Sequence, residues 1–363
     1  MSTTENSLLA ALGELIDTNT GKSFASAKAI KTVRLADGKA EITAELGYPA
    51  ASQFNAIARQ LEAAARAFPA VNTASATVSS KVVAHAVQGT VKLLPGVKNI
   101  IAVSSGKGGV GKSTTAVNLA LALAQEGARV GILDADIYGP SQPQMLGIAD
   151  AQPQTEDGKT MLPLEAHGLQ ANSIGFLIDP EQPMVWRGPM VTQALRQLLF
   201  ETRWTDLDYL VIDMPPGTGD IQLTLAQTVP VTGAVIVTTP QDIALLDARK
   251  GLKMFEKVGI PILGIVENMS IHVCSNCGHA EHIFGSGGGE SMCADYGVPF
   301  LGDLPLDIKI RSQTDSGKPT VVAEPDGAIA AAYRSIARKV AVSIAEKQRD
   351  MRLRFPTIVV NKD

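Results

Sequence analysis

A glycine-rich stretch constrains the fold of this chain more than any other feature. It reads Gly106-Lys107-Gly108-Gly109-Val110-Gly111-Lys112-Ser113 and fits the pattern G-x-x-x-x-G-K-[ST] at every fixed position. An apolar run at residues 99–103 precedes it and predicts a buried strand, and an Ala- and Leu-rich run at 114–125 predicts a helix. Glycines at such a junction let the backbone turn sharply and approach a ligand, while successive N–H groups and the helix N-terminus form an anion site. The stretch therefore predicts a loop that binds the phosphates of a nucleoside triphosphate.

Individual side chains of this loop have separate expected tasks. Lys112 is expected to reach the β- and γ-phosphates of the nucleotide, and the Ser113 hydroxyl to bind Mg²⁺. A glycine-rich turn that binds nothing is disfavoured, because strand, helix and all fixed positions agree. The expected nucleotide contacts are Gly106, Lys107, Gly108, Gly109, Val110, Gly111, Lys112, Ser113 and Thr114.

Composition limits the class of protein. The chain has 363 residues, enough for more than one domain. With 32 Lys+Arg against 36 Asp+Glu, the net charge of −4 gives no support for a general nucleic-acid binder. The N-terminus lacks the basic region of a signal peptide, and no apolar run approaches the length of a membrane span. We therefore expect a cytoplasmic protein with no nucleic-acid partner and no stable membrane association.

The first part of the chain, residues 1–80, predicts a small α+β domain. The expected order is a helix at 6–16, strands at 29–35 and 40–46 joined by a turn at Asp37-Gly38, a helix at 52–67 and a strand at 74–78. This part contains no Cys and no phosphate loop, which favours a docking or scaffold module. Residues 81–97 are expected to form a linker.

From residue 98 to 345, strand and helix patterns alternate. Several strands are continuous apolar runs, as in a parallel sheet that is covered on both faces. The sequence therefore predicts an α/β fold, a doubly wound, mostly parallel sheet with its ligand site at the carboxyl ends of the strands. Residues 346–363 are expected to form a basic C-terminal tail. Strands are expected at 99–103, 130–134, 209–213, 234–238, 262–267 and 298–303, and helices at 114–125, 189–200, 243–258, 308–316 and 328–349.

Polar residues follow three of these strands. Asp213, at the end of 209–213, is expected to hold Mg²⁺ through water. Asp134 and Asp136 follow the strand at 130–134, where one carboxylate could orient an attacking water or sense the metal. Asn268 follows 262–267, and its amide could bond a purine edge, although the residues alone favour an ordinary turn Asn.

A pair of cysteines, Cys274 and Cys277, is the second strong feature. Two thiolates on one tight loop suit a soft metal, but zinc and [4Fe–4S] centres usually need four ligands. A symmetric dimer could bring two pairs together. Zinc and iron–sulfur are about equally favoured by the residues alone, and a redox dithiol is disfavoured because the pair does not open a helix of a thioredoxin-like unit. Cys293 is expected to be a buried small apolar residue rather than a ligand. The residues that could complete a site within one chain are Cys293, His272, His279 and His282.

The chain resembles a known family at Lys107, whose place in the loop matches the signature lysine of deviant Walker-A ATPases. These include partition and division-site ATPases, nitrogenase iron protein and the Mrp/ApbC iron–sulfur carriers. Longer segments resemble the Mrp/ApbC group, and the resemblance covers residues 98 to about 345. The first eighty residues resemble a small iron–sulfur assembly domain, although Asp17-Thr18-Asn19 stands where an Asp-Pro pair is expected. The segments are Asp134-Ala135-Asp136-Ile137-Tyr138-Gly139-Pro140-Ser141, Trp186-Arg187-Gly188-Pro189-Met190, Asp213-Met214-Pro215-Pro216-Gly217-Thr218-Gly219-Asp220 and Glu267-Asn268-Met269-Ser270.

The resemblance implies roles for particular residues. Lys107 would reach the partner's phosphates across a homodimer and act in catalysis with Lys112 and Asp136, the latter near the attacking water. Asn268 would contact adenine. The cysteine pair of each subunit would bridge one [4Fe–4S] cluster, which moves the balance from zinc to iron–sulfur.

The sequence thus predicts an ATP-hydrolysing carrier or scaffold that binds an iron–sulfur cluster at a dimer interface and passes it to apo-proteins. One alternative is a partition or positioning ATPase that binds membrane or DNA. The basic tail with Arg349, Arg352 and Arg354 gives that alternative slight support, but the cysteine pair has no purpose in it. Another alternative is an electron-transfer reductase like nitrogenase iron protein, which is disfavoured because both cysteines lie on one loop.

Overall fold

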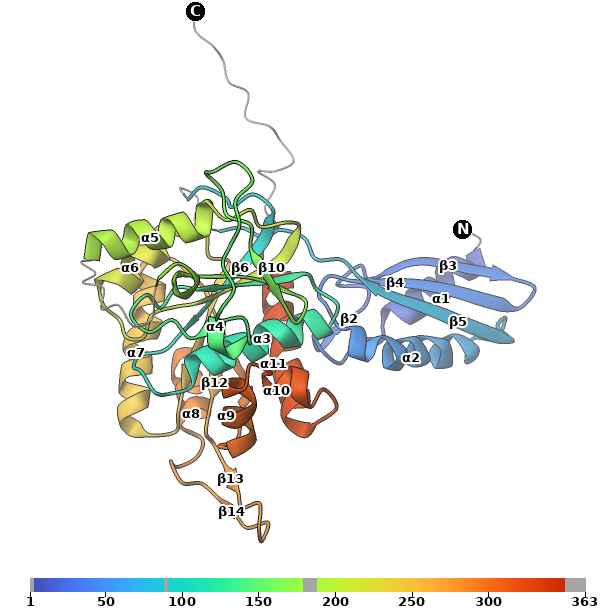
Figure 1. Cartoon of the computed structure of the whole chain (residues 1–363). Coiled ribbons are helices and arrows are strands. Elements are labelled where there is room, and N and C mark those ends of the chain that lie inside the picture. The colour runs from blue at the N-terminus through green and yellow to red at the C-terminus, as the bar shows by residue number, and fades with distance from the viewer. Residues whose placement is uncertain (1–2, 88–90, 179–187, 350–363) are drawn as a thin grey trace, which may run out of the picture.

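A computed structural model of the chain describes residues 3–87, 91–178 and 188–349. These residues form a small three-stranded sheet with its helices and a larger eight-stranded sheet with helices on both faces (Figure 1). None of the described helices is long and apolar enough to cross a membrane.

The small sheet lies in the first eighty residues and has the predicted order of elements. Strands β3 and β4 are antiparallel, and β5 runs parallel to β4 at the other edge. Helix α2 buries Ile57, Leu61 and Ala65, which lie four residues apart and so share one helix face. The predicted helix at 6–16 ends earlier, because Ile16–Asp17 pairs as a short strand with Lys22–Ser23. The bounds are α1 Thr3–Gly13, β1 Ile16–Asp17, β2 Lys22–Ser23, β3 Ile30–Ala36, β4 Lys39–Leu46, α2 Phe54–Arg66 and β5 Thr73–Ser80.

The large sheet has the strand order β15-β12-β11-β6-β10-β7-β9-β8. Neighbouring strands are parallel except for β8, which pairs antiparallel with β9 at one edge. Strand β6, which leads into the glycine-rich loop, lies near the middle, and every residue of β7, β10 and β11 is buried. The bounds are β6 Val97–Ser104, β7 Val130–Asp134, β8 Leu164–Ala166, β9 Leu169–Ser173, β10 Leu207–Asp213, β11 Gly233–Thr238, β12 Ile262–Glu267 and β15 Phe300–Asp303.

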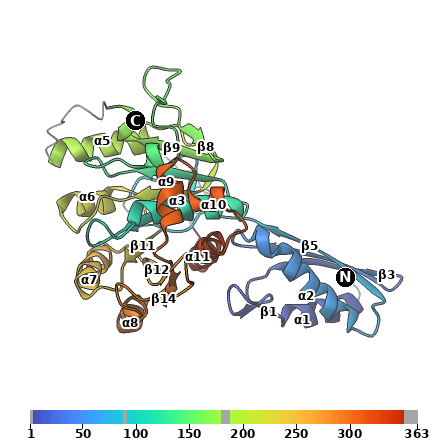
Figure 2. The ribbon, with the colours of Figure 1, turned by 60° about the horizontal axis from the view of Figure 1, so that its bottom comes forward.

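Helices cover both faces of this sheet. Alternate residues of β6 point to opposite faces, so Ile101 and Val103 pack in one apolar cluster and Ile100 and Ala102 in the other. The first cluster includes residues of α3 and α11, and the second includes residues of α5 to α8. Figure 2 shows how these helices are arranged around the sheet. The bounds are α3 Lys112–Gln125, α4 Gln142–Met145, α5 Gly188–Phe200, α6 Asp220–Thr228, α7 Asp242–Lys257, α8 Gly288–Tyr296, α9 Ile308–Asp315, α10 Thr320–Ala323 and α11 Ala328–Ala345. The doubly wound α/β fold predicted from the sequence is therefore confirmed.

Two further differences from the sequence-based expectations concern the large sheet unit. The C-terminal helix was expected to reach residue 349 but ends at Ala345. Arg349 instead pairs with His85 through the backbone, as an isolated antiparallel β-bridge. Strands β8 and β9 were not predicted, because their residues mix polar and apolar types without regular alternation. Arg352, Arg354, Trp186 and Arg187 lie outside the described residues.

The small sheet unit packs against the large one. Glu126, at the end of α3, accepts hydrogen bonds from the backbone and hydroxyl of Ser52 at 3.0 and 2.7 Å. Arg338 of α11 pairs with the same carboxylate at 2.6 Å, and the Glu126 side chain is fully buried. The apolar cluster on the α3 face continues into the small unit through residues such as Tyr48 and Ala50. Polar and apolar contacts therefore join the two parts of the chain.

Candidate nucleotide site and cysteine hairpin

The glycine-rich loop connects the end of β6 to the start of α3, as its sequence predicts. Gly111 precedes α3 with φ +79°, a left-handed conformation that favours glycine. A Cβ at Gly106 would lie 2.0 Å from the backbone of Asp247, and one at Gly111 would lie 2.2 Å from the Asn268 amide. These two glycines are required because other backbone and side-chain atoms approach the loop closely.

Lys112 lies at the centre of a buried polar group. Its Nζ forms a short ion pair with Asp213 and donates to the Ser113 hydroxyl at 3.0 Å. The Lys112 side chain is 6% exposed and that of Asp213 is fully buried, so each charge compensates the other in a dry environment. The side-chain amide of Gln142 donates to the second Asp213 oxygen at 2.9 Å and to the Ser113 carbonyl at 3.2 Å. Gln142 belongs to none of the sequence motifs that predicted this site.

Asp134 and Asp213 are neighbours, because β7 and β10 are adjacent and the two residues are paired in register. Burial and the Asp213 carboxylate raise the pKa of Asp134. The Asp134 carboxylate accepts hydrogen bonds from the backbone of Ser141 and Gln142 and from the Ser173 hydroxyl. The strand ends thus hold two neighbouring carboxylates, and the charge of Lys112 acts on both.

This donor set fits Mg²⁺ as it binds with a nucleotide. Within the described residues, no group of three or more His, Cys, Asp or Glu side chains could hold a metal ion. Mg²⁺ usually takes one or two protein oxygen ligands and completes its shell with phosphates and water. The Oε1 atom of Gln142 is also buried without a hydrogen-bond partner among those residues, so the site can accept further polar contacts.

Asp136 and Lys107 lie beside this group. Burial raises the pKa of Asp136, whose carboxylate accepts a hydrogen bond from the Gly139 backbone at 3.3 Å. The backbone carbonyl of Lys107 accepts from the Ser105 hydroxyl at 2.8 Å, and the Lys107 side chain is half-buried. Their catalytic roles stay predictions.

Asn268 contacts the phosphate loop itself. Its side-chain amide donates to the Val110 carbonyl at 2.9 Å, and its backbone N–H donates to Thr238 at 2.7 Å. The side chain is 7% exposed. Asn268 therefore supports the loop from the end of β12, and its predicted contact with adenine stays a prediction.

Cys274 and Cys277 lie on a hairpin that projects from the body of the molecule (Figure 1). Its short antiparallel strands are β13 (His272–Val273) and β14 (Ala280–Glu281). Backbone N–H groups of Cys277 and Asn276, followed by the Cys277 side chain, lower the pKa of Cys274. Cys274 is half-buried and Cys277 exposed, and both are free thiols. The hairpin thus presents two free thiols, and the surroundings of Cys274 favour its thiolate form.

Three of the four residues considered for a one-chain metal site have other contacts or are buried. His272 donates through Nδ1 to the Leu306 carbonyl at 2.9 Å, and His282 to the Ser270 carbonyl at 2.6 Å. Cys293 is 5% exposed within α8, and burial raises the pKa of its thiol to about 11. Its prediction as a buried apolar residue is confirmed. Among the residues that the structure describes, no group of three or more His, Cys, Asp or Glu side chains is placed to hold a metal ion, so a site completed within one copy has no support there.

Most exposed large apolar side chains of the described residues belong to segments next to the carboxyl ends of the strands, the edge that holds the phosphate loop. In parallel strands all carboxyl ends meet at one edge, and the loops and helix starts that follow them lie there. Among the described residues, Ile16 is the exposed large apolar side chain that lies elsewhere, in the small unit. Those at the carboxyl edge are Tyr138, Leu177, Met190, Ile243, Leu246, Val273, Ile283 and Ile308.

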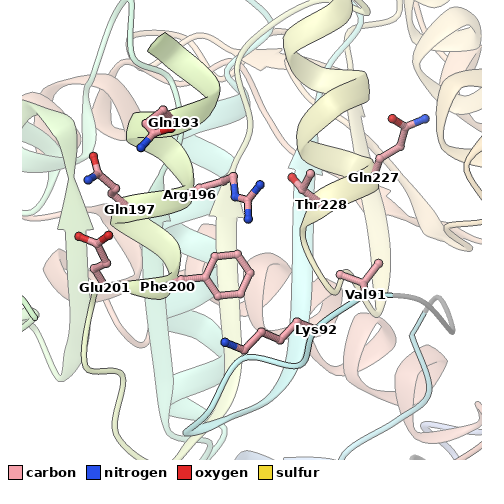
Figure 3. Close-up of a pocket in the computed structure, with 9 residues that line it drawn as sticks. All are labelled: Val91, Lys92, Gln193, Arg196, Gln197, Phe200, Glu201, Gln227 and Thr228. Carbon is pink, nitrogen blue, oxygen red and sulfur yellow. The ribbon is translucent and has the colours of Figure 1, made fainter. Parts of the chain in front are cut away.

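A separate cavity of about 610 Å³ lies between the C-terminal ends of α5 and α6 and residues 91–92 (Figure 3). Arg196, Phe200 and Lys92 are among its lining residues. Because α5 and α6 run opposite to the strands, their C-terminal ends lie at the amino edge of the sheet. This cavity is therefore not part of the phosphate-loop site.

A doubly wound sheet, with this loop after a central strand and acidic residues after the neighbouring strands, defines a P-loop NTPase. The family model for the NUBPL iron-transfer P-loop NTPase matches residues 96–341, and that for an iron–sulfur cluster assembly protein matches residues 5–78. The chain therefore belongs to the NUBPL iron-transfer P-loop NTPase family, which confirms the predicted resemblance.

Curated relatives and a solved structure agree with this assignment. An iron–sulfur cluster carrier protein of Pseudomonas fragi is 63% identical over 74% of this chain and 93% of the relative. One from Synechocystis is 46% identical over 94% of this chain and 98% of the relative. A nucleotide-binding protein from Archaeoglobus fulgidus in complex with ADP is 37% identical, with a TM-score of 0.56 over 64% of this chain and 90% of that protein.

Proposed function

We propose that this P-loop NTPase carries an iron–sulfur cluster, hydrolyses ATP during loading or transfer, and passes the cluster to apo-proteins. The observation that carries the proposal is the surface hairpin with Cys274 and Cys277, which follows β12 at the same sheet edge as the phosphate loop. The names of the relatives, iron–sulfur cluster carrier proteins, support the cargo.

A shared cluster explains why each chain offers two thiols. A [4Fe–4S] cluster held by proteins usually takes four thiolates. Two copies related by a two-fold axis would supply them as two identical pairs. The exposed apolar side chains at the carboxyl edge support a contact between copies on that face. The homodimer and the [4Fe–4S] type of cluster are parts of this proposal.

The nucleotide chemistry follows from the buried polar group. ATP phosphates would attract Lys112 away from Asp213, and that carboxylate would then be free for Mg²⁺ with Ser113. Bound Mg²⁺ would neutralise charge on the β- and γ-phosphates. Asp136 would orient the attacking water, and Lys107 would reach the phosphates bound by the partner copy.

Cysteine replacement tests the proposal. Cys274→Ala and Cys277→Ala proteins, purified anaerobically and analysed for iron, sulfide and zinc, should lose iron and sulfide but keep ATP binding. Wild-type protein should contain iron and sulfide at about one cluster per two chains, with a mass that corresponds to a dimer. Cys293→Ala is the matched control and should keep the cluster. Retained iron in both hairpin variants, or zinc without sulfide in the wild type, would contradict the assignment.

A further inference from the structure

Glu267 is a buried carboxylate for which the ATPase chemistry described above has no use. It is the last residue of β12, and its side chain is 3% exposed. Within the described residues it forms no ion pair with Lys or Arg. Its oxygens accept hydrogen bonds from the backbone N–H groups of Gly287 at 3.3 Å and Gly289 at 2.5 Å. These N–H groups lie at the start of α8, where the helix dipole stabilises a negative charge.

The local sequence is adapted to this contact. A Cβ at Gly289 would lie 3.0 Å from a Glu267 carboxylate oxygen and 3.1 Å from the Glu267 Cβ. A Cβ at Gly288 would lie 2.5 Å from the Leu245 side chain. Glycines thus let the start of α8 approach both β12 and α7, and only a backbone without side chains brings the N–H groups so close to the carboxylate.

The contact closes the loop that carries the cysteines. Glu267 precedes the hairpin, and Gly287 follows it. The first side of the hairpin is attached to the body through His272 and through the Leu306 backbone N–H, which donates to Ile271 at 2.8 Å. The return side is attached by His282, which bonds to Ser270, and by the Glu267 contact. Because His282 is itself exposed, Glu267 provides the buried attachment of that side.

The same strand end also reaches the phosphate loop. Asn268, the residue next to Glu267, donates to the Val110 carbonyl. One short segment therefore contacts the nucleotide loop through one residue and the base of the hairpin through its neighbour.

We propose that Glu267 is a positioning residue for the cysteine pair: by capping α8 it fixes the base of the hairpin at the nucleotide end of β12. This inference rests on the proposed function for its meaning in cluster binding. The contact itself can be tested without any cluster.

The first measurement is hydrogen exchange of the apo-protein, followed by mass spectrometry. Glu267→Gln removes the charge and one acceptor, and Gly289→Ala displaces the same carboxylate from the other side. In both variants the amides of residues 272–286 should exchange about 10-fold faster. Glu290→Gln makes the same chemical change at an exposed site in the first turn of α8 and should leave exchange unchanged.

The second measurement is iron release from reconstituted protein to a chelator. Loss of a group that orients metal ligands typically costs 10- to 100-fold in metal binding. We therefore expect release at least about 10-fold faster in Glu267→Gln and Gly289→Ala, with Cys293 still protected from alkylation because α8 stays in place.

The outcomes separate the two proposals. Exchange and iron release equal to wild type would overturn the role of Glu267 and leave the carrier function intact. Reaction of Cys293 with the alkylating agent would show that the whole helix has detached, and it would also overturn a positioning role. Retained iron in the cysteine variants would instead contradict the proposed carrier function, independently of the hydrogen-exchange rates.

Discussion

At the scale of the residue, Lys107 and Lys112 differ in their surroundings although both belong to one loop. Lys112 is buried and paired with Asp213, whereas Lys107 is half-buried and, within the described part of the chain, bonds to Ser105 through its backbone carbonyl. A lysine whose amine is not bound to the site of its own chain is suited to act on a neighbouring copy.

Lys107→Ala should therefore leave ATP binding largely intact and slow hydrolysis by ~10³-fold or more, since charges supplied in trans to phosphoryl transfer are worth ~10³–10⁵. The measurements are nucleotide affinity by fluorescence titration and phosphate release at saturating ATP. Lys250→Ala, at an exposed Lys of α7, is the control and should change neither quantity. Unchanged hydrolysis in Lys107→Ala would remove the role across the dimer.

The site was predictable from sequence where the chemistry lies in contiguous residues. In the loop from Gly106 to Ser113 and in the cysteine pair, the residue types and their spacing along the chain are enough to predict a candidate site. Gln142 and Glu267 were missed because their partners lie 71 and 22 residues away in the chain, and only the fold brings them together. An acidic residue at the end of a fully apolar strand, such as Glu267, was the one available signal.

At the scale of the element, the segment before β6 is attached through His85. This side chain is 2% exposed, and the amide oxygen of Asn99 lies 3.1 Å from its Nδ1. Burial is the main cause that lowers the pKa of His85, and the nearby Arg349 acts in the same direction. The folded protein therefore favours the neutral imidazole.

The stability of the fold should depend on this group at mildly acidic pH. A pKa lowered by folding gives stability that is fully present above the unfolded value of about 6.5 and is lost as pH falls through the folded value. Between pH 8 and pH 5, the midpoint of urea unfolding should fall less in His85→Gln than in wild type. His279→Gln, at an exposed site, should follow the wild type. A parallel decline in wild type and His85→Gln would show that His85 protonation does not contribute.

Most elements were predictable because their patterns are strong. Strands such as β7 and β11 are continuous buried apolar runs, and a parallel sheet needs such runs. Strand β9 was not predictable, since Leu169–Ser173 owes its place to pairing with β7 rather than to its own composition. The end of α11 was also misplaced, because the sequence after Ala345 remains compatible with a helix.

At the scale of the whole molecule, Glu126 joins the small unit to the large one. Its buried carboxylate is shared by Ser52 and Arg338, so one group connects three segments that are far apart in the chain. Arg338→Met should lower the free energy of unfolding by about 3 kcal/mol, because it leaves a buried carboxylate without a cation.

Arg311→Met is the matched control for that prediction. Arg311 pairs with Asp315 at 3.2 Å, but both side chains are more than 60% exposed. Removal of this pair should cost no more than about 0.5 kcal/mol. Chemical denaturation of both variants measures the difference, and equal effects would mean that the contact at Glu126 does not stabilise the junction.

The carboxyl edge of the sheet has a consequence for how copies of this chain can assemble. Apart from Ile16, the exposed large apolar side chains of the described residues all lie on that edge. A molecule with one apolar face forms a closed two-fold dimer when two such faces meet. The face is then buried in both copies, so a third copy cannot bind to it. Growth into open filaments would need a second, complementary apolar face, and among the described residues the exposed apolar side chains fit the closed pair that we propose.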